Sequence, residues 1–492
     1  MTDHFPTVII GAGPAGLTAA YELVRNGMRP LVLEQGSQVG GIARTEVYKG
    51  YRFDIGGHRF YTKVKEVEDL WREMMGDDFI KVPRLSRIYY KGRFYQYPLS
   101  FLNTLTNLGL TESFLVLMSY CKARITPHRD EQTFEEWVTN RFGSRLYRTF
   151  FQAYTEKVWG IPCNKIQAEW AAQRIQNLSL VKAVANALFG SNGVKSLINE
   201  FDYPRLGPGQ MWERFQQAVE DRGGAVHLNT TIVRLNYEGN RVTSVVARRD
   251  GQEFEMAAPH FISSMPINKL VLHMNPQPPE AVVKAAQSLS YRAFVLVGLI
   301  VRRENLFPDN WIYIHSPELS VGRIQNFGNW SAAMVPEPGK SCLGMEYFCN
   351  AGDDLWKTPD QELIRLAEKE LIELGLARDG DVEDGVVIRQ PKAYPVYDSE
   401  YRGHLEVIKS FLDQFTNLQT VGRNGMHRYN NQDHSMLTGM LAVKNILGEK
   451  HDLWDVNTER SYYEEFTTTD APKPASAHLH STGVIPQLHE AE

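Results

Sequence analysis

The chain has 492 residues, 43% of them hydrophobic and 23% charged, and its 53 Lys and Arg against 58 Asp and Glu give a formal net charge of −5. This length and composition predict two or three domains around sizeable cores, and the charge gives no support for nucleic acid or an anionic membrane as a bulk partner. The four cysteines are scattered without a CxxC pair, which favours a reduced, cytoplasmic protein.

The N-terminus runs straight into a predicted strand, so we expect no signal peptide, and no later run of eighteen apolar residues predicts a membrane span. Residues 8–34 have the pattern strand, glycine turn, helix, strand. In the turn, Gly11 makes the tight bend, Gly13 lets the backbone approach a pyrophosphate, and Gly16 lets the helix pack on the strand. Glu34 would accept hydrogen bonds from a ribose 2′-hydroxyl and repel a 2′-phosphate. The pattern therefore predicts FAD or NAD rather than NADP.

A second glycine-rich stretch decides between these two cofactors. Gly40-Gly41-Ile42-Ala43-Arg44-Thr45 follows Glu34, and Asp54-Ile55-Gly56-Gly57-His58 comes shortly afterwards. The first resembles the extended fingerprint of the FAD-containing amine-oxidase-like superfamily, and the second resembles its flavin-ring loop. The resemblance implies FAD, bound by residues that include Gly40, Gly41, Arg44, Gly57 and His58. His58 is also a candidate catalytic residue, although a histidine in such a loop more often bonds to a backbone carbonyl, and we expect it to position the flavin.

Apolar periodicity predicts the order of the domains. Residues 86–95 have the pattern of a hairpin, and residues 99–199 carry many helical stretches. Short strands resume at 223–256, strand-like runs at 294–349 precede a helix at 359–374, and a strand, a loop and a long helix occupy 418–447. We expect an α/β chain with a Rossmann-like FAD-binding domain (1–98, 201–270 and 401–466), a helical insertion (99–200), an antiparallel β-sheet substrate domain (271–400) and a disordered tail (467–492).

The middle of the chain carries a more specific signal. Tyr154-Thr155-Glu156-Lys157-Val158-Trp159-Gly160-Ile161-Pro162 resembles a segment of the UDP-galactopyranose mutase family, especially its eukaryotic branch. Arg174 stands fifteen residues after Trp159, where that family places a diphosphate-binding arginine. Trp311, Tyr313 and Arg323 keep the family's spacing of an aromatic pair and a second diphosphate arginine. The resemblance implies that Arg174 and Arg323 are catalytic and that Trp159, Trp311 and Tyr313 bind substrate.

The closing segment strengthens this resemblance. Gly422-Arg423, then Arg428-Tyr429, then Asn431-Gln432-Asp433-His434-Ser435 resemble the mutase ending, whereas amine oxidases and desaturases usually have Gly-Asp at the first position. The resemblance implies that Tyr394, Tyr429 and Asn431 bind substrate and that Arg423 pairs with the FAD pyrophosphate. The sequence departs from the mutases at Ser100, Thr155 and Trp330, which leaves a different nucleotide or a different sugar open.

These observations give a first hypothesis and two alternatives. The first is a nucleotide-sugar mutase that interconverts pyranose and furanose rings, in which the resemblance implies that N5 of reduced FAD attacks the anomeric carbon and displaces the nucleoside diphosphate. NAD(P)H or another reductant would supply the electrons. The alternatives are an FAD-dependent oxidoreductase of the amine oxidase or desaturase type, and a non-catalytic FAD-binding protein. No metal site is expected, and the oligomeric state is open.

Overall fold

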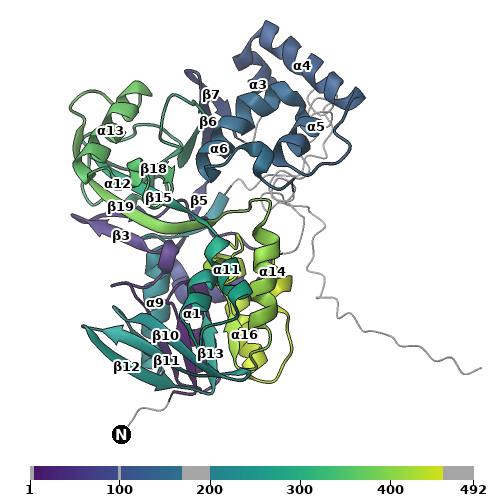
Figure 1. Ribbon diagram of the computed structural model, residues 1–492. Coiled ribbons are helices and arrows are strands. Elements are labelled where there is room, and N and C mark those ends of the chain that lie inside the picture. Colours follow the sequence, from purple (N-terminus) through teal and green to yellow (C-terminus); the bar gives the residue numbers. More distant parts are fainter. Residues whose placement is uncertain (1–4, 98–100, 169–199, 458–492) are drawn as a thin grey trace, which may run out of the picture.

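The computed structural model describes residues 5–97, 101–168 and 200–457 (Figure 1). Its central layer is a parallel sheet of five strands in the order β20-β13-β1-β2-β9. The strands are β1 (Thr7–Ile10), β2 (Pro30–Leu33), β9 (Ala225–His227), β13 (His260–Ser263) and β20 (Leu418–Thr420). Because the chain leaves this sheet and returns to it several times, the predicted Rossmann-like domain is assembled from distant segments.

Alternate residues of β1 and β2 pack on opposite faces of this sheet. Ile9 and Val32 face helices α1 (Pro14–Arg25), α9 (Pro208–Asp221) and α16 (Gln432–Ile446). Val8 and Leu31 face a four-stranded sheet of β10 (Thr231–Glu238), β11 (Arg241–Arg249), β12 (Gln252–Ala257) and β14 (Met274–Asn275). Burial on both faces explains why the parallel strands are continuous apolar runs in the sequence.

A larger sheet forms the second part of the molecule. Its seven strands have the order β19-β15-β18-β17-β16-β6-β7. They are β6 (Ser86–Tyr90), β7 (Arg93–Gln96), β15 (Tyr291–Val301), β16 (Trp311–Ile314), β17 (Arg323–Asn326), β18 (Ser341–Cys349) and β19 (Val382–Pro395). All neighbours are antiparallel except β6 and β16, which pair in parallel, so the expected antiparallel sheet is in fact mixed. The predicted hairpin β6–β7 is confirmed, but it extends this sheet although the sequence placed it in the first part of the FAD-binding domain.

Helices between β7 and β8 (Glu200–Pro204) flank this sheet. They are α3 (Phe101–Leu108), α4 (Leu110–Ile125), α5 (Phe134–Leu146) and α6 (Ala153–Trp159), with a π-helical turn at Tyr147–Gln152. Gly109, with φ of 84°, separates α3 from α4. Thr133 and Glu136 form a capping box that begins α5. The helical insertion is therefore confirmed as far as residue 168, while Arg174 and the tail from residue 467 lie outside the described residues.

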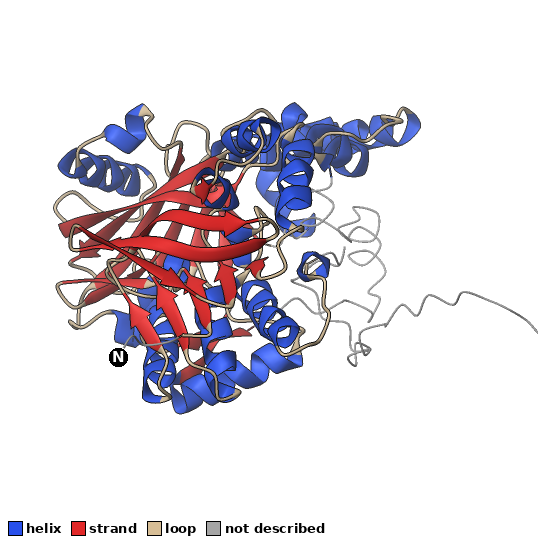
Figure 2. Cartoon of the chain, turned by 60° about the horizontal axis from the view of Figure 1, so that its bottom comes forward, coloured by secondary structure: helices blue, strands red, loops and turns tan. Residues whose placement is uncertain are grey.

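Shorter elements complete the fold, and Figure 2 shows the strands through the middle of the molecule with helices around them. They are β3 (Thr45–Tyr48), β4 (Tyr51–Asp54), α2 (Lys65–Met75), β5 (Phe79–Pro83), α10 (Ile267–Leu272), α11 (Glu280–Ser288), α12 (Asp354–Lys357), α13 (Asp360–Glu373), α14 (Tyr401–Leu412) and α15 (Gly422–Gly425). Among the described residues, no helix has the length and apolar content needed to cross a bilayer.

Candidate active site

A cavity of about 410 Å³ lies where the helices, the seven-stranded sheet and the N-terminus of α16 meet. Ten of the residues singled out from the sequence line it: Gly57, His58, Trp159, Trp311, Tyr313, Arg323, Tyr394, Arg423, Tyr429 and Asn431. The structure therefore brings most of the candidate substrate residues to one place. Their individual roles stay predictions.

The three glycines of the first turn meet different constraints. A Cβ on Gly16 would lie 1.9 Å from the carbonyl oxygen of Gly11, and a Cβ on Gly11 would lie 2.3 Å from Oγ of Ser264. A Cβ on Gly13 would meet only an ordinary contact, 3.8 Å from Cα of Gly41. Backbone packing therefore explains Gly16, a φ of 98° explains Gly11, and close approach of a ligand explains Gly13.

The first turn of α1 is suited to hold a pyrophosphate. Gly13 is its N-cap and makes no side-chain capping hydrogen bond, so the first amides of the helix keep their donors for an anion. At the end of β2, the Glu34 carboxylate accepts hydrogen bonds from the backbone nitrogens of Ala12 and Gly36, at 2.8 and 2.7 Å. Oxygen lone pairs remain for a ribose hydroxyl. These residues fit the pyrophosphate and ribose of FAD.

The second glycine motif is anchored to the first. The amide of Gly40 donates to the carbonyl of Ala12 at 2.8 Å, and Gly40 and Gly41 have φ of 100° and 56°. The Arg44 guanidinium donates to Glu46 at 2.6 Å and to the carbonyl of Gly41 at 2.9 Å. Arg44 thus holds the turn in shape within the described structure, and its expected contact with FAD stays a prediction.

His58 occupies a glycine loop over the large sheet. Nδ1 of His58 lies 3.1 Å from the carbonyl oxygen of Gly56. Burial, reinforced by the charge of Arg423, lowers the pKa of His58 to about 3, so the ring is neutral near pH 7. Because a carbonyl can only accept, Nδ1 carries the proton and Nε2 remains an acceptor toward the cavity. This matches a positioning role better than that of a proton donor.

The sheet presents an arginine to the cavity beside this loop. Trp311, Tyr313 and His315 alternate along β16 and its extension, and all three line the cavity. Tyr313 lies opposite Arg323 on β17, which in turn lies opposite Glu346 on β18. Nε and Nη2 of Arg323 both contact Oε2 of Glu346 at 2.7 Å, while Nη1 has no partner among the described residues. One edge of the guanidinium therefore remains for an anionic ligand.

Electrostatics keep this arginine charged. Burial opposes ionisation, but attraction to Glu346 and then to the hydroxyl of Tyr394 outweighs it, so the pKa of Arg323 is raised well above its ordinary value. Glu346 also accepts from Nε2 of Gln325 at 2.8 Å. Sequence analysis did not identify Glu346, because its role depends on the pairing of β17 with β18.

Aromatic residues form the opposite wall. The rings of Tyr394 and Tyr429 stack with centroids 5.7 Å apart, and Trp159 lies 6.2 Å from Tyr394. The guanidinium of Arg423 lies 4.6 Å from the Tyr429 ring centroid and donates to the carbonyl of Asn430 at 2.9 Å. These contacts hold Arg423 beside the aromatic wall, and its pairing with the FAD pyrophosphate stays a prediction.

Helix α16 directs its N-terminus at the same cavity. Asn431, Gln432, Asp433 and His434 line the cavity, and the amide of Asn431 donates to Nδ1 of His434 at 3.2 Å. A helix N-terminus carries a partial positive charge, which would stabilise negative charge on a bound flavin or substrate.

Four buried polar atoms of cavity residues have no hydrogen-bond partner in the described part of the chain. They are Nε1 of Trp311, Nδ1 of His315, Oε1 of Gln325 and Oε1 of Gln432. Buried polar atoms are rarely left unpaired in folded proteins, so these atoms point to a polar ligand. Sequence analysis missed His315, Gln325 and Gln432 as site residues, although alternation with Tyr313 and Arg323 could have indicated the first two.

Comparisons with solved structures agree on the fold. A reduced UDP-galactopyranose mutase superposes with a TM-score of 0.81 at 21% identity, covering 93% of this chain and 99% of that one. A putative protoporphyrinogen oxidase from Exiguobacterium sp. 255-15 superposes with a TM-score of 0.70 at 16% identity, covering 91% and 99%. At these identities the likeness shows a shared fold.

Curated relatives match shorter segments. The dTDP-fucopyranose mutase of Escherichia coli is 29% identical over 171 residues, which are 33% of this chain and 43% of that protein. A probable flavin-containing monoamine oxidase A of Dictyostelium discoideum is 28% identical over 152 residues, or 28% and 33% of the two chains. The chain thus matches less than half the length of either relative.

One family match runs over most of the sequence. The family described as flavin containing amine oxidoreductase matches residues 14–403, from the first turn of α1 into α14. The matched region includes the second glycine motif, the Gly56-Gly57-His58 loop and the whole of the large sheet. The chain therefore belongs to the flavin-containing amine oxidoreductase family, which implies a flavin cofactor.

Proposed function

We propose that the protein is an FAD-dependent nucleotide-sugar mutase that interconverts pyranose and furanose forms of its substrate. The observation that carries this proposal is Arg323, a half-buried, charged arginine with one open edge, in an aromatic-walled cavity beside the Gly56-Gly57-His58 loop. An arginine edge next to the expected flavin ring suits a substrate with a diphosphate leaving group. A simple amine without an anionic group would gain nothing from this cation.

Each part of the cavity has a role under this proposal. Arg323 would hold the diphosphate and stabilise the negative charge that grows on it as it leaves, while Glu346 fixes the orientation of the guanidinium. The stacked Tyr394 and Tyr429 would pack against the sugar and diphosphate, and neutral His58 would hold the flavin loop through Gly56. Reduced FAD would supply the nucleophile that exchanges with the diphosphate. Arg174 would contribute a second cation, as the sequence resemblance implies.

The comparisons support this proposal without deciding it. The mutase structure shares the fold across nearly the whole chain, and a mutase acting on a dTDP-linked sugar is among the curated relatives. Oxidases of the same family match segments of similar length. A flavin oxidoreductase that takes a hydride from its substrate is therefore the second candidate, favoured by the family as a whole.

A substrate panel tests the proposal. Purified enzyme reduced with dithionite under argon is incubated with UDP-, dTDP- and GDP-linked hexopyranoses, and products are separated by anion-exchange chromatography. We expect a furanose product from at least one nucleotide sugar and none from oxidised enzyme. A parallel incubation of the oxidised enzyme in air supplies the other outcome. Oxidation of a substrate coupled to hydrogen peroxide formation there, without ring contraction of any nucleotide sugar by the reduced enzyme, would support the oxidoreductase instead.

A further inference from the structure

Helix α4 presents an apolar stripe outward from the protein. The stripe consists of Leu110, Phe114, Leu117, Met118 and Ile125, whose exposed fractions are 92, 62, 39, 54 and 79%. Their spacing of 4, 7, 8 and 15 residues from Leu110 places all five on one side of the helix. Figure 1 shows α4 at the outer edge of the molecule. Contiguous exposed apolar side chains of this size mark an interaction surface.

The side of α4 that packs against the protein is a different side of the helix and carries smaller residues than the stripe. The side chains buried against the protein are the smaller Ser113, Val116 and Ala123, and α4 packs on α5 and α3. The largest apolar groups of the helix therefore face away from the core that the described residues form. A helix that packed only on its own domain would show the reverse pattern.

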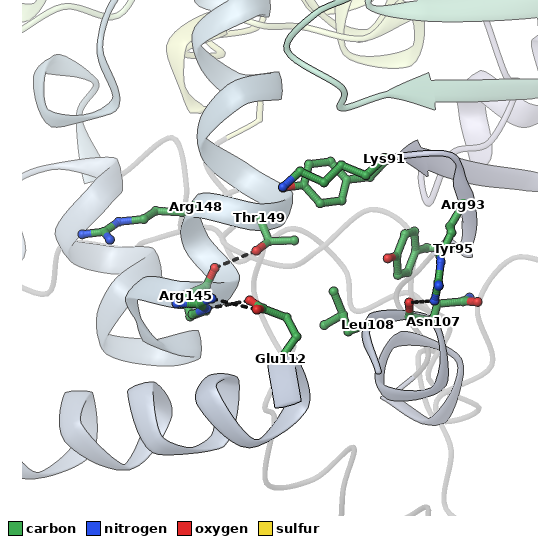
Figure 3. Close-up of a pocket in the computed structure, with 10 residues that line it drawn as sticks. Lys91, Arg93, Tyr95, Asn107, Leu108, Glu112, Arg145, Arg148 and Thr149 are labelled. Atoms are coloured by element: carbon green, nitrogen blue, oxygen red, sulfur yellow. Dashed lines mark hydrogen bonds and ion pairs between the residues drawn. The ribbon is translucent and has the colours of Figure 1, made fainter. Parts of the chain in front are cut away.

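A basic cavity adjoins the N-terminal end of the same helix. It has a volume of about 420 Å³ and is lined by Lys91, Arg93, Arg145 and Arg148, together with Glu112 from the first turn of α4 (Figure 3). Glu112 neutralises Arg145 through contacts of 2.6 and 2.7 Å. Arg93 bonds to the backbone of α3, whereas the guanidinium of Arg148 has no partner among the described residues. The cavity therefore carries a net positive charge.

The part of the sequence that contains the stripe has a net positive charge. Residues 91–148 hold eight Lys and Arg and five Asp and Glu, a net charge of +3 (8 − 5), in a chain whose overall charge is −5. Lys122 and Arg124 are exposed on the last turn of α4, next to Ile125. The helical region is thus basic although the whole chain has a negative net charge.

We propose that the helical region docks reversibly on an anionic lipid surface, with the α4 stripe in the interfacial layer and the surrounding Lys and Arg on lipid phosphates. Apolar groups in line along a helix, flanked by Lys and Arg, are the features that bind helices to such surfaces. A second copy of the chain is a poorer occupant, because a symmetric contact would bring two sets of Lys122, Arg124 and Arg148 together. This inference does not depend on the proposed function, but it does revise the expectation that membranes play no part.

Vesicle flotation of the full-length protein tests the proposal. We expect the protein to float with vesicles of phosphatidylcholine containing 30% phosphatidylglycerol, to remain behind with pure phosphatidylcholine, and to be released by 0.5 M NaCl. Phe114→Glu should lower the partition coefficient about tenfold or more. Lys122→Glu with Arg124→Glu should lower it about twentyfold. Leu447→Glu, which changes an apolar residue beyond α16 that is 49% exposed, is the matched control and should float like wild type.

Three results would overturn the proposal. The first is flotation that is absent, or equal with and without the anionic lipid. The second is a wild-type dimer in sedimentation equilibrium that Phe114→Glu converts to a monomer, without lipid binding by either, which would make the stripe a self-association surface. The third is a Cys121 thiol that resists maleimide in the native protein, since Cys121 is exposed on this side of α4 and the other three cysteines are buried.

Discussion

At the scale of single residues, the partnership of Arg323 with Glu346 changes how the arginine should be tested. Glu346 has a fully buried side chain, so removing Arg323 alone leaves an uncompensated buried charge and should cost about 3–5 kcal/mol of unfolding free energy. Arg323→Met combined with Glu346→Gln removes both charges and should recover much of that loss. If Arg323 binds the diphosphate, kcat/KM of the double variant should still fall about ten- to a hundredfold.

A second arginine–carboxylate pair, between β6 and the loop before β16, supplies the control. Arg87 on β6 contacts the buried Asp309 at 2.9 Å, outside the candidate site. Arg87→Met should lower the midpoint of denaturant unfolding to a similar extent while the protein that remains folded keeps its kcat/KM. Equal losses of activity in the Arg87 and Arg323 variants would mean that Arg323 acts only through stability.

Asp54 gives a prediction on pH and stability. It accepts a hydrogen bond from Thr45 at 2.8 Å and another from the Tyr203 hydroxyl, and burial raises its pKa from 3.8 to about 7. Between pH 4 and pH 7 the unfolded chain has lost this proton while the folded chain keeps it. The carboxyl group should therefore lower the unfolding free energy by up to about 1.4 kcal/mol per pH unit as the pH rises, with no further loss above pH 7.

Substitution of Asp54 isolates this contribution. Asp54→Asn cannot ionise, so its unfolding free energy, measured with guanidinium at pH 5, 6, 7 and 8, should lack the slope that wild type shows below pH 7. Parallel curves for the two proteins across this range would show that Asp54 is ionised in the folded state.

At the scale of elements, two glycines of the turn between β1 and α1 should affect different properties when they are substituted, Gly13 flavin binding and Gly16 stability. Gly13→Ala places a Cβ in ordinary contact with Gly41, so the fold should survive while the turn can no longer approach a pyrophosphate closely. Gly16→Ala collides with the carbonyl of Gly11 and should destabilise the whole protein. The measurement is the ratio of acid-released flavin to protein, alongside the thermal midpoint of the apoprotein. A Gly13→Ala protein with full flavin content would contradict the assignment of this turn.

The elements also show what the sequence can predict. Strands β1 and β15 are buried apolar runs, and the turn of α1 depends on residues close together in the chain, so both were predictable. Strand β19 was missed because it lies at the edge of the sheet, where charged residues replace the apolar pattern.

Contacts between elements that are distant in the sequence could not be predicted from the sequence pattern. Nζ of Lys157 on α6 lies 2.8 to 3.2 Å from four backbone carbonyl oxygens of residues 314–321, among which its three N–H donors are shared, and so fixes the segment between β16 and β17. Neither this clamp nor the Arg323–Glu346 pair follows from spacing along the chain. The candidate site residues proposed from sequence were those with local motifs or a family resemblance.

At the scale of the whole molecule, distant segments meet at one cavity. The Gly56-Gly57-His58 loop follows β4, Arg323 comes from the large sheet, Trp159 from the helical region, and Asn431 is the N-cap of α16. The residues that line the cavity therefore come from several parts of the fold. This arrangement would suit either a mutase or an oxidoreductase. The two activities differ in whether turnover consumes electrons, so an electron count distinguishes them.

The most direct test of the mutase proposal is the number of product molecules formed per reducing equivalent. Enzyme reduced once with a measured amount of dithionite under argon is given an excess of the nucleotide sugar that the panel identifies, and product is counted against the electrons supplied. A mutase regenerates its reduced flavin in each cycle, so we predict many furanose products per reduction and a flavin absorbance that stays bleached throughout. One product for every two electrons, or steady oxygen consumption in proportion to product when air is admitted, would contradict the account.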